Sequence, residues 1–316
     1  MLTDRLKATI FGDKAAVKQR AKYVVERLTE PETIRPLLER DRAYAAYALG
    51  QLEPRLFPRS EWWQACGPGG EALVVHARSG LGPAMVAVGD PPALDALLRL
   101  HPGPRFTFAT FQLEHLPLAQ RHFVLSTPTP SLRMSVSSHS FRPVEGPALS
   151  RSPERSEGAA KGPARRLHGS DLADVNALQL SDGFGFYSAA ALDDGTYYGV
   201  YADDRLVAMA GTHVAAPSCG LAIVGNVVTH PRYRGHGYAT IATSAVTAEL
   251  LKTCPWVLLT VREANEPAIR LYRRLGYREE CRLIESAARR KDMLGLAGLV
   301  RRFLTRRRSN GREVVE

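Results

Sequence analysis

The sequence predicts an α/β (α+β) protein with two lobes, and three observations lead to this fold class. Short strand patterns rich in Val and Ala alternate with helical segments along most of the chain. A strand, a tight glycine turn and a helix follow one another over 221–252. A stretch of Pro, Gly, Ser and mixed charge at 145–163 separates two such regions. The length of 316 residues allows one large domain or two medium ones.

The N-terminal lobe is predicted over residues 1–142. Its first segment, to about Asp41, is charged and is predicted to be helical. It contains no apolar region of the secretory-signal type. Beyond it, the expected helices are 41–52, 92–99 and 114–121, and the expected strands are 72–77, 84–88, 106–111 and 132–140. This lobe has no equivalent of the glycine turn at 235–237, and we expect it to wall the acceptor site or to form a homodimer contact.

Residues 143–163 are predicted to be a flexible linker and residues 164–288 a second α/β domain. Ser170 is a candidate cap for the first helix of this domain. Asp203-Asp204 is a favourable turn pair, which predicts a hairpin. The expected strands are 196–202, 205–214, 221–229, 256–261 and 277–286, and the expected helices are 171–180, 238–252 and the segment between Pro267 and Gly276.

The turn from Arg232 to Gly237 has the features of an anion site. Glycines at the start of a helix let the backbone come close to a ligand. The free N–H groups of the first helical turn favour phosphate oxygens, and Arg232 and Arg234 add positive charge. An ordinary strand-to-helix turn remains the alternative for this segment alone. The dinucleotide motif G-x-G-x-x-G needs a third glycine where this chain has Thr240, and no Gly-Lys-Ser/Thr of a P-loop is present.

A second segment supports the prediction of a phosphate site at this turn. The pattern R-x-x-G-x-G-x-A at 232–239 is followed by N-x-x-A-x-x-L-Y-x-x-L-G-Y at 265–277. In this order and separation the pair resembles the GNAT superfamily of acyl-CoA N-acyltransferases, and the resemblance covers 167–286. It implies a mixed, mostly antiparallel sheet flanked by helices. The two-lobed layout is similar to tandem-GNAT or glycine-N-acyltransferase-like proteins, so the N-terminal lobe is expected to be a degenerate GNAT-like lobe.

The resemblance also implies roles for individual residues. Tyr272 would be the general acid that protonates the thiolate of departing CoA, with a packed helix tyrosine as the alternative. Asn265 would bond or position the pantetheine, and it can also cap its helix. Backbone amides over 234–239 would hold the CoA pyrophosphate, and the strand edge at 227–229 would pair with pantetheine. The implied cofactor-binding set is Val227, Val228, Thr229, Arg232, Arg234, Gly235, His236, Gly237, Tyr238, Ala239 and Asn265.

The acceptor side and the general base are less defined. Phe184, Phe186 and Tyr187, in a Gly/aromatic loop, are candidates for contacts with the substrate or for simple packing. Many GNAT relatives carry a glutamate on the central strand as the base, but this strand has no carboxylate. A water relay, His230 or His213 could take that role instead.

Composition narrows the class of protein. Hydrophobic residues make up 45% of the chain, but no run of eighteen apolar residues exists to span a membrane. The four cysteines are scattered without C-x-x-C spacing, which predicts no metal site and no disulfide framework and favours a reducing, cytoplasmic setting. The net charge is +10, of which nine Lys/Arg against three acids (9 − 3 = +6) lie in 289–316. This basic tail could form an amphipathic helix over 293–307 that contacts a membrane surface or nucleic acid, or simply a solubilising terminus.

The sequence therefore predicts an enzyme that transfers an acetyl group from acetyl-CoA to a primary amine of a small molecule or protein by direct attack. No metal is implied. Two alternatives remain: a non-catalytic acyl-CoA-binding regulatory protein, and a nucleic-acid-binding protein that uses the basic tail, which is the less favoured of the two. The acceptor amine is not identified by the sequence.

Overall fold

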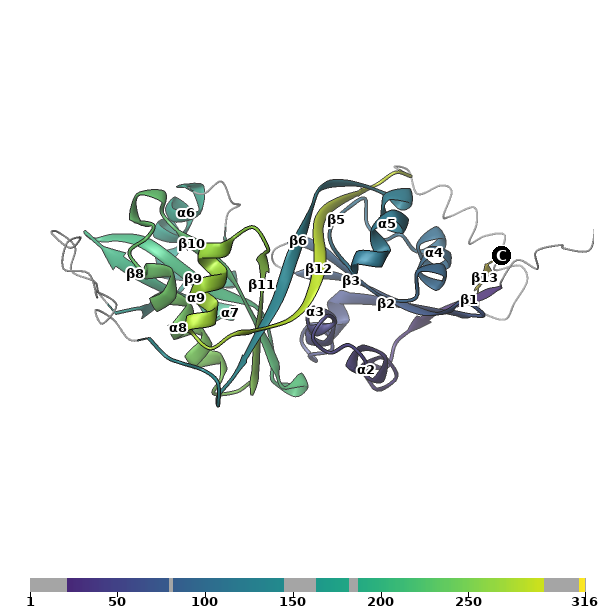
Figure 1. Cartoon of the computed structure of the whole chain (residues 1–316), viewed down its shortest axis with the longest axis horizontal. Coiled ribbons are helices and arrows are strands. Elements are labelled where there is room, and N and C mark those ends of the chain that lie inside the picture. Colours follow the sequence, from purple (N-terminus) through teal and green to yellow (C-terminus); the bar gives the residue numbers. More distant parts are fainter. Residues whose placement is uncertain (1–21, 80–81, 145–162, 182–186, 293–312, 316) are drawn as a thin grey trace, which may run out of the picture.

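The computed structural model consists of two lobes that share one continuous β-sheet (Figure 1). Within the described residues this sheet has 13 strands, in the order β13-β1-β2-β3-β4-β5-β12-β6-β11-β10-β9-β8-β7. Neighbouring strands are antiparallel except for the pairs β4–β5 and β10–β11, which are parallel. The predicted mixed, mostly antiparallel sheet with flanking helices is thereby confirmed. The structure describes residues 22–79, 82–144, 163–181, 187–292 and 313–315.

The elements have the following bounds. The strands are β1 Tyr23–Leu28, β2 Ser60–Gly67, β3 Gly70–Ser79, β4 Gly82–Gly89, β5 Phe106–Phe111, β6 Phe123–Ser137, β7 Arg165–Arg166, β8 Tyr198–Ala202, β9 Arg205–Ala216, β10 Leu221–Thr229, β11 Trp256–Arg262, β12 Arg278–Arg290 and β13 Glu313–Val315. The α-helices are α2 Pro31–Glu39, α3 Ala46–Gly50, α4 Pro91–Leu100, α5 Leu116–His122, α6 Leu172–Ser181, α7 Ala189–Asp194, α8 Tyr238–Leu250 and α9 Glu266–Arg274.

Two long strands, β6 and β12, join the lobes at the centre of the sheet (Figure 1). β6, from the first half of the chain, pairs with β11 of the second half. β12, from the end of the second half, pairs with β6 and also with β5. Each lobe therefore completes its part of the sheet with a strand from the other half of the sequence. The boundaries of 142 and 164 that the sequence suggested stay predictions, and the two halves are tied together by backbone hydrogen bonds rather than by a linker alone.

An apolar core between the lobes fixes their relative position. It combines Leu38 and Leu49 of the N-terminal lobe with Val214, Leu221 and Leu258 of the other half, and all of these are buried. A Cβ at Gly50 of α3 would lie 2.4 Å from Cγ1 of Val214, so the helix can approach β9 this closely only because the residue is glycine. The N-terminal lobe thus packs directly on one face of the sheet that carries β9 and β10.

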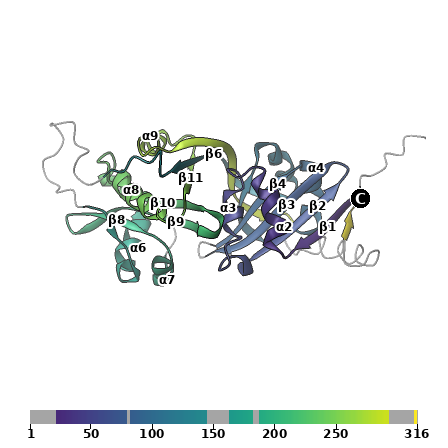
Figure 2. The ribbon, with the colours of Figure 1, turned by 90° about the horizontal axis from the view of Figure 1, so that it is seen from below.

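The helices of the second half cover opposite faces of that sheet (Figure 2). Helices α8 and α9 pack on one face, where Tyr238, Ile241, Ile269 and Tyr272 share a core with strands β10 and β11. Helix α6 packs on the other face through Val175 and other buried side chains near Met209. Consequently, one face of β10 and β11 looks toward α8 and α9, and the other looks toward α6 and the N-terminal lobe.

Several sequence predictions of elements were wrong. The segment before Asp41 contains strand β1 rather than continuous helix, because Val24 and Val25 pair with Cys66 and Ala65 of β2 and this pairing outweighs local helix propensity. Strand β2 was not predicted, since its sequence SEWWQACG lacks a regular apolar alternation. The helix expected over 41–52 is only the short α3, preceded by turns. The expected strand over 132–140 begins nine residues earlier, as β6.

Other local predictions agree with the structure. The hairpin of β8 and β9 turns at Asp203 and Asp204, whose φ values of 50° and 58° match a turn that needs two left-handed residues. Ser170 lies within a short 3₁₀ turn before α6 rather than at the cap position. The basic tail helix over 293–307 and the 145–162 part of the linker lie outside the described residues. No helix within the described ranges is long and apolar enough to cross a bilayer.

Candidate active site

The site is built around a gap in the pairing of two parallel strands. β10 and β11 pair only over Leu221↔Trp256 to Val224↔Leu259, although both strands continue further. Beyond that point β10 stays paired with β9, and β11 stays paired with β6. The facing edges of residues 225–229 and 260–262 therefore carry backbone groups without a strand partner, a segment that we call the strand opening. Such an edge can accept an extended ligand by β-addition.

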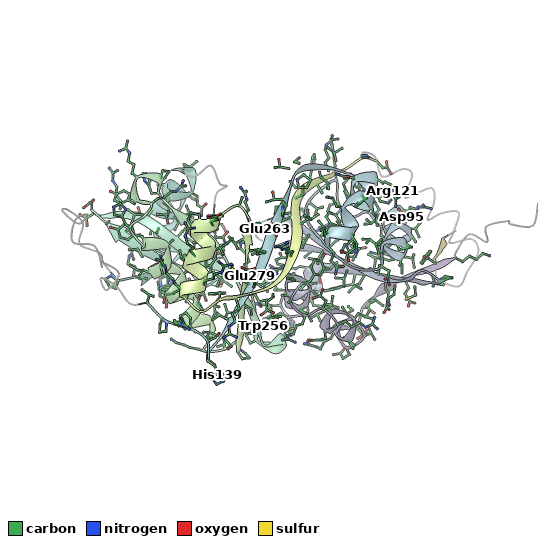
Figure 3. The ribbon with its side chains drawn as sticks, in the orientation of Figure 1. Asp95, Arg121, His139, Trp256, Glu263 and Glu279 are labelled. Carbon is green, nitrogen blue, oxygen red and sulfur yellow. The ribbon has the colours of Figure 1, made fainter. Side chains whose placement is uncertain are left out.

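The parallel direction of β10 and β11 brings two helix N-termini to the same edge of the sheet. Trp256 at the start of β11 and Glu263 just after its end mark the two opposite edges (Figure 3). Helix α8 follows β10 and helix α9 follows β11, so both begin at the edge near Glu263. The turn before α8 and the first residue of the α9 motif, Asn265, consequently lie at the same edge as the strand opening.

The turn at the head of α8 presents a row of backbone amides. Gly235 and Gly237 have φ values of +83° and +82°, which non-glycine residues rarely adopt. Among the described residues no acceptor receives a hydrogen bond from the N–H groups of residues 235–239. The His236 ring nitrogen Nδ1 lies 2.9 Å from the carbonyl oxygen of Arg234 and holds that carbonyl within the turn. The free amides and the helix dipole together form a site for an anion.

Charge and side-chain anchoring support the same turn. Arg234 Nε donates to the carbonyl oxygen of Thr229 at 3.3 Å, which ties the turn to the end of β10. Arg232 is exposed at the same corner. The His230 ring accepts from the Arg232 N–H at 3.3 Å and so caps the 3₁₀ turn at 231–233. His230 therefore has a structural task at this corner.

Helix α9 positions Asn265 and Tyr272, the two residues predicted to act in catalysis. Asn265 caps the helix, since its Oδ1 accepts from the Ala268 N–H at 3.3 Å. Tyr272 lies two turns further on, is 6% exposed, and packs in the core under α8 and α9. Burial raises the pKa of the Tyr272 hydroxyl well above its ordinary value. At neutral pH it is therefore a neutral phenol that can donate a proton.

A β-bulge opposite the strand opening brings together residues that the sequence did not pair. Asn226 has φ +54°, and the register of β10 on β9 shifts between Gly225 and Val228. Asn226 Oδ1 lies 3.0 Å from His213 Nε2 of β9, and the His213 ring lies over Gly225, where a Cβ would be 2.3 Å from that nitrogen. His213 thus lies on the face opposite α8 and α9. A Gly-Asn pair inside the strand was the one signal of this bulge in the sequence.

A family comparison matches this part of the chain. The model of the acetyltransferase (GNAT) family matches residues 170–277, which include the strand opening, the amide turn and the α9 motif. Residues 170–277 form a GNAT-family domain. The family supports acyl transfer as the general activity. No curated protein matches the sequence.

Solved structures resemble both lobes. A GCN5-related N-acetyltransferase from Sphaerobacter thermophilus is 17% identical, with a TM-score of 0.53, over 85% of this chain and 95% of that one. A Drosophila protein is 13% identical, with a TM-score of 0.56, over 83% of this chain and 97% of that one. A tandem GNAT protein from the clavulanic acid biosynthesis pathway is 15% identical, with a TM-score of 0.47, over 85% and 98%. Because the first alignment extends well beyond the GNAT domain, the N-terminal lobe shares the GNAT fold as well.

The N-terminal lobe differs from the GNAT domain at the corresponding turn. Its parallel pair is β4 and β5, and α4 follows β4 as α8 follows β10. Asp90 precedes α4, and the helix begins with two prolines. The start of the helix therefore has a carboxylate and lacks two N–H groups. The Tyr44 hydroxyl donates to the carbonyl oxygen of Ala87 at 2.6 Å and lies 3.3 Å from that of Thr110, which closes the space between the two strands. The start of α4 therefore lacks the arrangement of glycines and free amides that is found at the start of α8.

The aromatic loop of the GNAT domain is described only at its end. Phe184 and Phe186 lie outside the described residues. Tyr187 is half-buried and packs edge-on against Tyr197, with ring centroids 5.7 Å apart. Its backbone N–H donates to Asn176 Oδ1 at 2.9 Å. These contacts give Tyr187 a packing role in the wall next to β9, and a role in substrate binding stays a prediction.

Proposed function

We propose that this protein is an acetyl-CoA-dependent N-acetyltransferase that acetylates a primary amine of a small molecule or peptide. The observation that carries the proposal is the row of free amides over 235–239 beside the strand opening at 225–229. This combination fits a ligand with a pyrophosphate followed by an extended, amide-containing arm. All four cysteines are free thiols, which supports a cytoplasmic location as part of the same proposal.

The amide turn would bind the pyrophosphate, and the edge of β10 would bind the pantetheine arm. Along Val227, Val228 and Thr229 the backbone groups point alternately toward β9 and toward the side that β11 leaves unpaired, and those on the unpaired side would bind the arm. The Thr229 carbonyl oxygen is the exception, because it accepts from Arg234 Nε. Arg232 and Arg234 would add charge to the phosphate corner. Asn265 would orient the arm from the start of α9. Hydrogen-bond donors near Val228 would polarise the thioester carbonyl, because preorganised donors stabilise the negative charge of the tetrahedral intermediate.

The acid and the base would approach the thioester from opposite faces of the sheet. Tyr272 belongs to the core under α8 and α9, whereas His213 lies over Gly225 on the other face. An amine on the His213 side would attack the carbonyl carbon while its proton passes to the base. The C–S bond would then break, and Tyr272 would donate its proton to the sulfur of the leaving thiolate.

His213 is the better candidate for the base than His230. The His230 ring already accepts a backbone hydrogen bond at the amide turn. Desolvation by surrounding protein atoms, opposed by the hydrogen bond with Asn226 and assisted by the Arg133 charge, lowers the pKa of His213. The His213 side chain also keeps an exposed surface. At neutral pH the imidazole is therefore mainly neutral and able to accept a proton.

The His213→Gln variant is expected to lose about 10²- to 10⁴-fold in kcat, the usual contribution of a general base. In the wild type, the kcat/KM profile should fall only below the ordinary histidine range, because protonation of His213 removes the base and its pKa is lowered. The variant should lack this acidic limb. A His230→Gln variant serves as control and should weaken acetyl-CoA binding more than it lowers kcat. Full activity of His213→Gln would leave a water relay as the base.

The direct test of the activity is release of free thiol from acetyl-CoA in the presence of an amine panel that includes amino acids, polyamines and a lysine peptide. The proposal predicts amine-dependent thiol release and an acetylated product by mass spectrometry. Binding of acetyl-CoA with no release for any amine would favour a regulatory acyl-CoA-binding protein. Absence of both binding and release would exclude the proposed function.

A further inference from the structure

A buried arginine that forms no ion pair with any described carboxylate lies in the central strand β6. Arg133 is 2% exposed, yet its neighbours Leu132 and Met134 point into the core that contains Tyr272. Because side chains alternate along a strand, Arg133 lies on the opposite face, which is the face of His213. This is the side from which the amine would reach the thioester.

The hydrogen bonds of Arg133 leave part of its guanidinium without a partner. Nη1 donates to Thr260 Oγ1 at 2.7 Å. Nε is buried and has no hydrogen-bond partner among the described residues. No described carboxylate lies within ion-pair distance of the guanidinium, although surface pairs such as Arg282 with Glu263 form at 3.2 Å. A buried charge in this state is unfavourable unless a ligand completes it.

Glu285, the acidic residue with the largest electrostatic effect on Arg133, does not take the place of such a ligand. Glu285 of β12 is half-buried and makes the largest favourable electrostatic contribution to Arg133. Burial raises the pKa of Glu285, while Arg133 and Arg262 only partly oppose this. Glu285 forms no ion pair with Arg133, so within the described residues the Arg133 Nε group still lacks an acceptor.

The position of Thr260 places this guanidinium beside the strand opening. Thr260 pairs with Arg133 across β11 and β6 and is the first residue of β11 beyond the segment paired with β10. Arg133 is hydrogen-bonded to Thr260, and the His213 ring lies over Gly225. Thr260 and Gly225 belong to the two facing edges of the strand opening, so both side chains border it. With Nη1 held by Thr260, the Nε and Nη2 groups form the side-on fork that fits a carboxylate.

We propose that Arg133 binds the carboxylate of the acceptor, so that the acceptor is an amino acid or another small amine that carries a carboxylate. The inference rests on the proposed N-acetyltransferase function. The buried fork would hold the carboxylate, while the amino group on the same molecule would face His213. Arg133 then determines substrate specificity, and it neither donates nor accepts the transferred proton.

The test compares free L-amino acids with their carboxamides and with the corresponding decarboxylated amines, using acetyl-CoA and thiol release. In the wild type, kcat/KM for the preferred acid should exceed that for its amide by at least about 100-fold, because a site built for a polar group rejects a ligand that lacks it. Arg133→Met should remove most of this preference and leave the amide within about threefold of wild type. Arg133→Lys should fall between the two, since it keeps the charge but loses the fork.

Controls separate this role from a structural one. Arg282→Met removes an exposed charge on the neighbouring strand. It should change kcat/KM neither for the acids nor for the amides. Thr260→Val keeps Arg133 but removes its anchor, and should raise KM for the acid about tenfold with a smaller effect on kcat. Acetyl-CoA affinity, measured on each variant, reports whether the site is still folded.

Equal losses for acids and amides in Arg133→Met and Thr260→Val would mean that Arg133 only holds the lobes together, and would overturn the inference. Wild-type preference for amines without a carboxylate would overturn it as well, while leaving the acetyltransferase function intact. Absence of acetyl-CoA binding and thiol release in the wild type would instead reject the proposed function on which the inference rests.

Discussion

Tyr272→Phe is expected to lower kcat by about 10²- to 10⁴-fold, the range of a general acid, with little change in the dissociation constant of acetyl-CoA. The substitution keeps the buried ring and removes only the hydroxyl, so the core under α8 and α9 should remain packed. The loss should be largest for the step that releases the thiolate, which needs a proton at sulfur. Steady-state kinetics with a calorimetric titration of acetyl-CoA would measure both quantities.

Tyr277→Phe is the matched control for this prediction. Tyr277 is also a buried tyrosine, and its ring centroid lies 6.0 Å from that of Tyr272. Its hydroxyl forms a hydrogen bond of 2.8 Å with Thr247 Oγ1. Loss of this bond should cost about 1 kcal/mol of unfolding free energy without a matching loss of kcat. Equal kinetic losses in both variants would contradict a specific acid role for Tyr272.

Gly235→Glu is expected to weaken acetyl-CoA binding by at least about 100-fold, because a carboxylate among the free amides of the turn repels the pyrophosphate. A Cβ at this position meets no protein atom within 4 Å, so steric clash with the chain does not explain the effect. Backbone strain at φ +83° does contribute. Calorimetric titration of acetyl-CoA would measure the change in the dissociation constant.

Gly235→Ala separates strain from charge at this turn. Alanine experiences the same positive φ as glutamate, and its conformational cost is about 1 to 2 kcal/mol. It adds no negative charge, so it should weaken binding clearly less than glutamate does. If the two variants bind acetyl-CoA equally well, the anion is not held at these amides, and the pyrophosphate site must lie elsewhere.

Local sequence signals were enough to predict the glycine turn before α8 and the capped start of α9. The turn glycines, the Asn265 cap and the spacing to Tyr272 are encoded within short segments, and each depends on backbone geometry near in sequence. The strand at 221–229 and the hairpin at Asp203-Asp204 were predicted for the same reason. These features need no knowledge of which distant strands become neighbours.

The proposed acceptor side depends on long-range contacts that local sequence patterns do not contain. His213 meets Asn226 only because a bulge shifts the register of β10 on β9. Arg133 meets Thr260 only because β6 leaves the first half of the chain and pairs with β11. Neither strand exchange nor bulge register can be derived from the alternation of apolar residues within one strand.

The N-terminal lobe illustrates the same limit. The absence of a glycine turn predicted a degenerate lobe, but not how its strand gap is closed. Tyr44 reaches across to the carbonyl oxygens of Ala87 and Thr110, which lie on two different strands. Asp90 also accepts from the Glu71 N–H at 3.0 Å, so its carboxylate is committed to the fold. In this GNAT-like lobe, these contacts fill positions that stay open in the GNAT domain.

The number of acetyl-CoA molecules bound per chain tests the central claim most directly. Calorimetric titration of the wild-type protein is expected to give one site per chain, because the GNAT domain offers free amides beside a strand opening and the N-terminal lobe has Asp90, two prolines and Tyr44 at the matching positions. Binding of two molecules would contradict the closed state of the N-terminal lobe. No binding would contradict the assignment of the amide turn as the cofactor site.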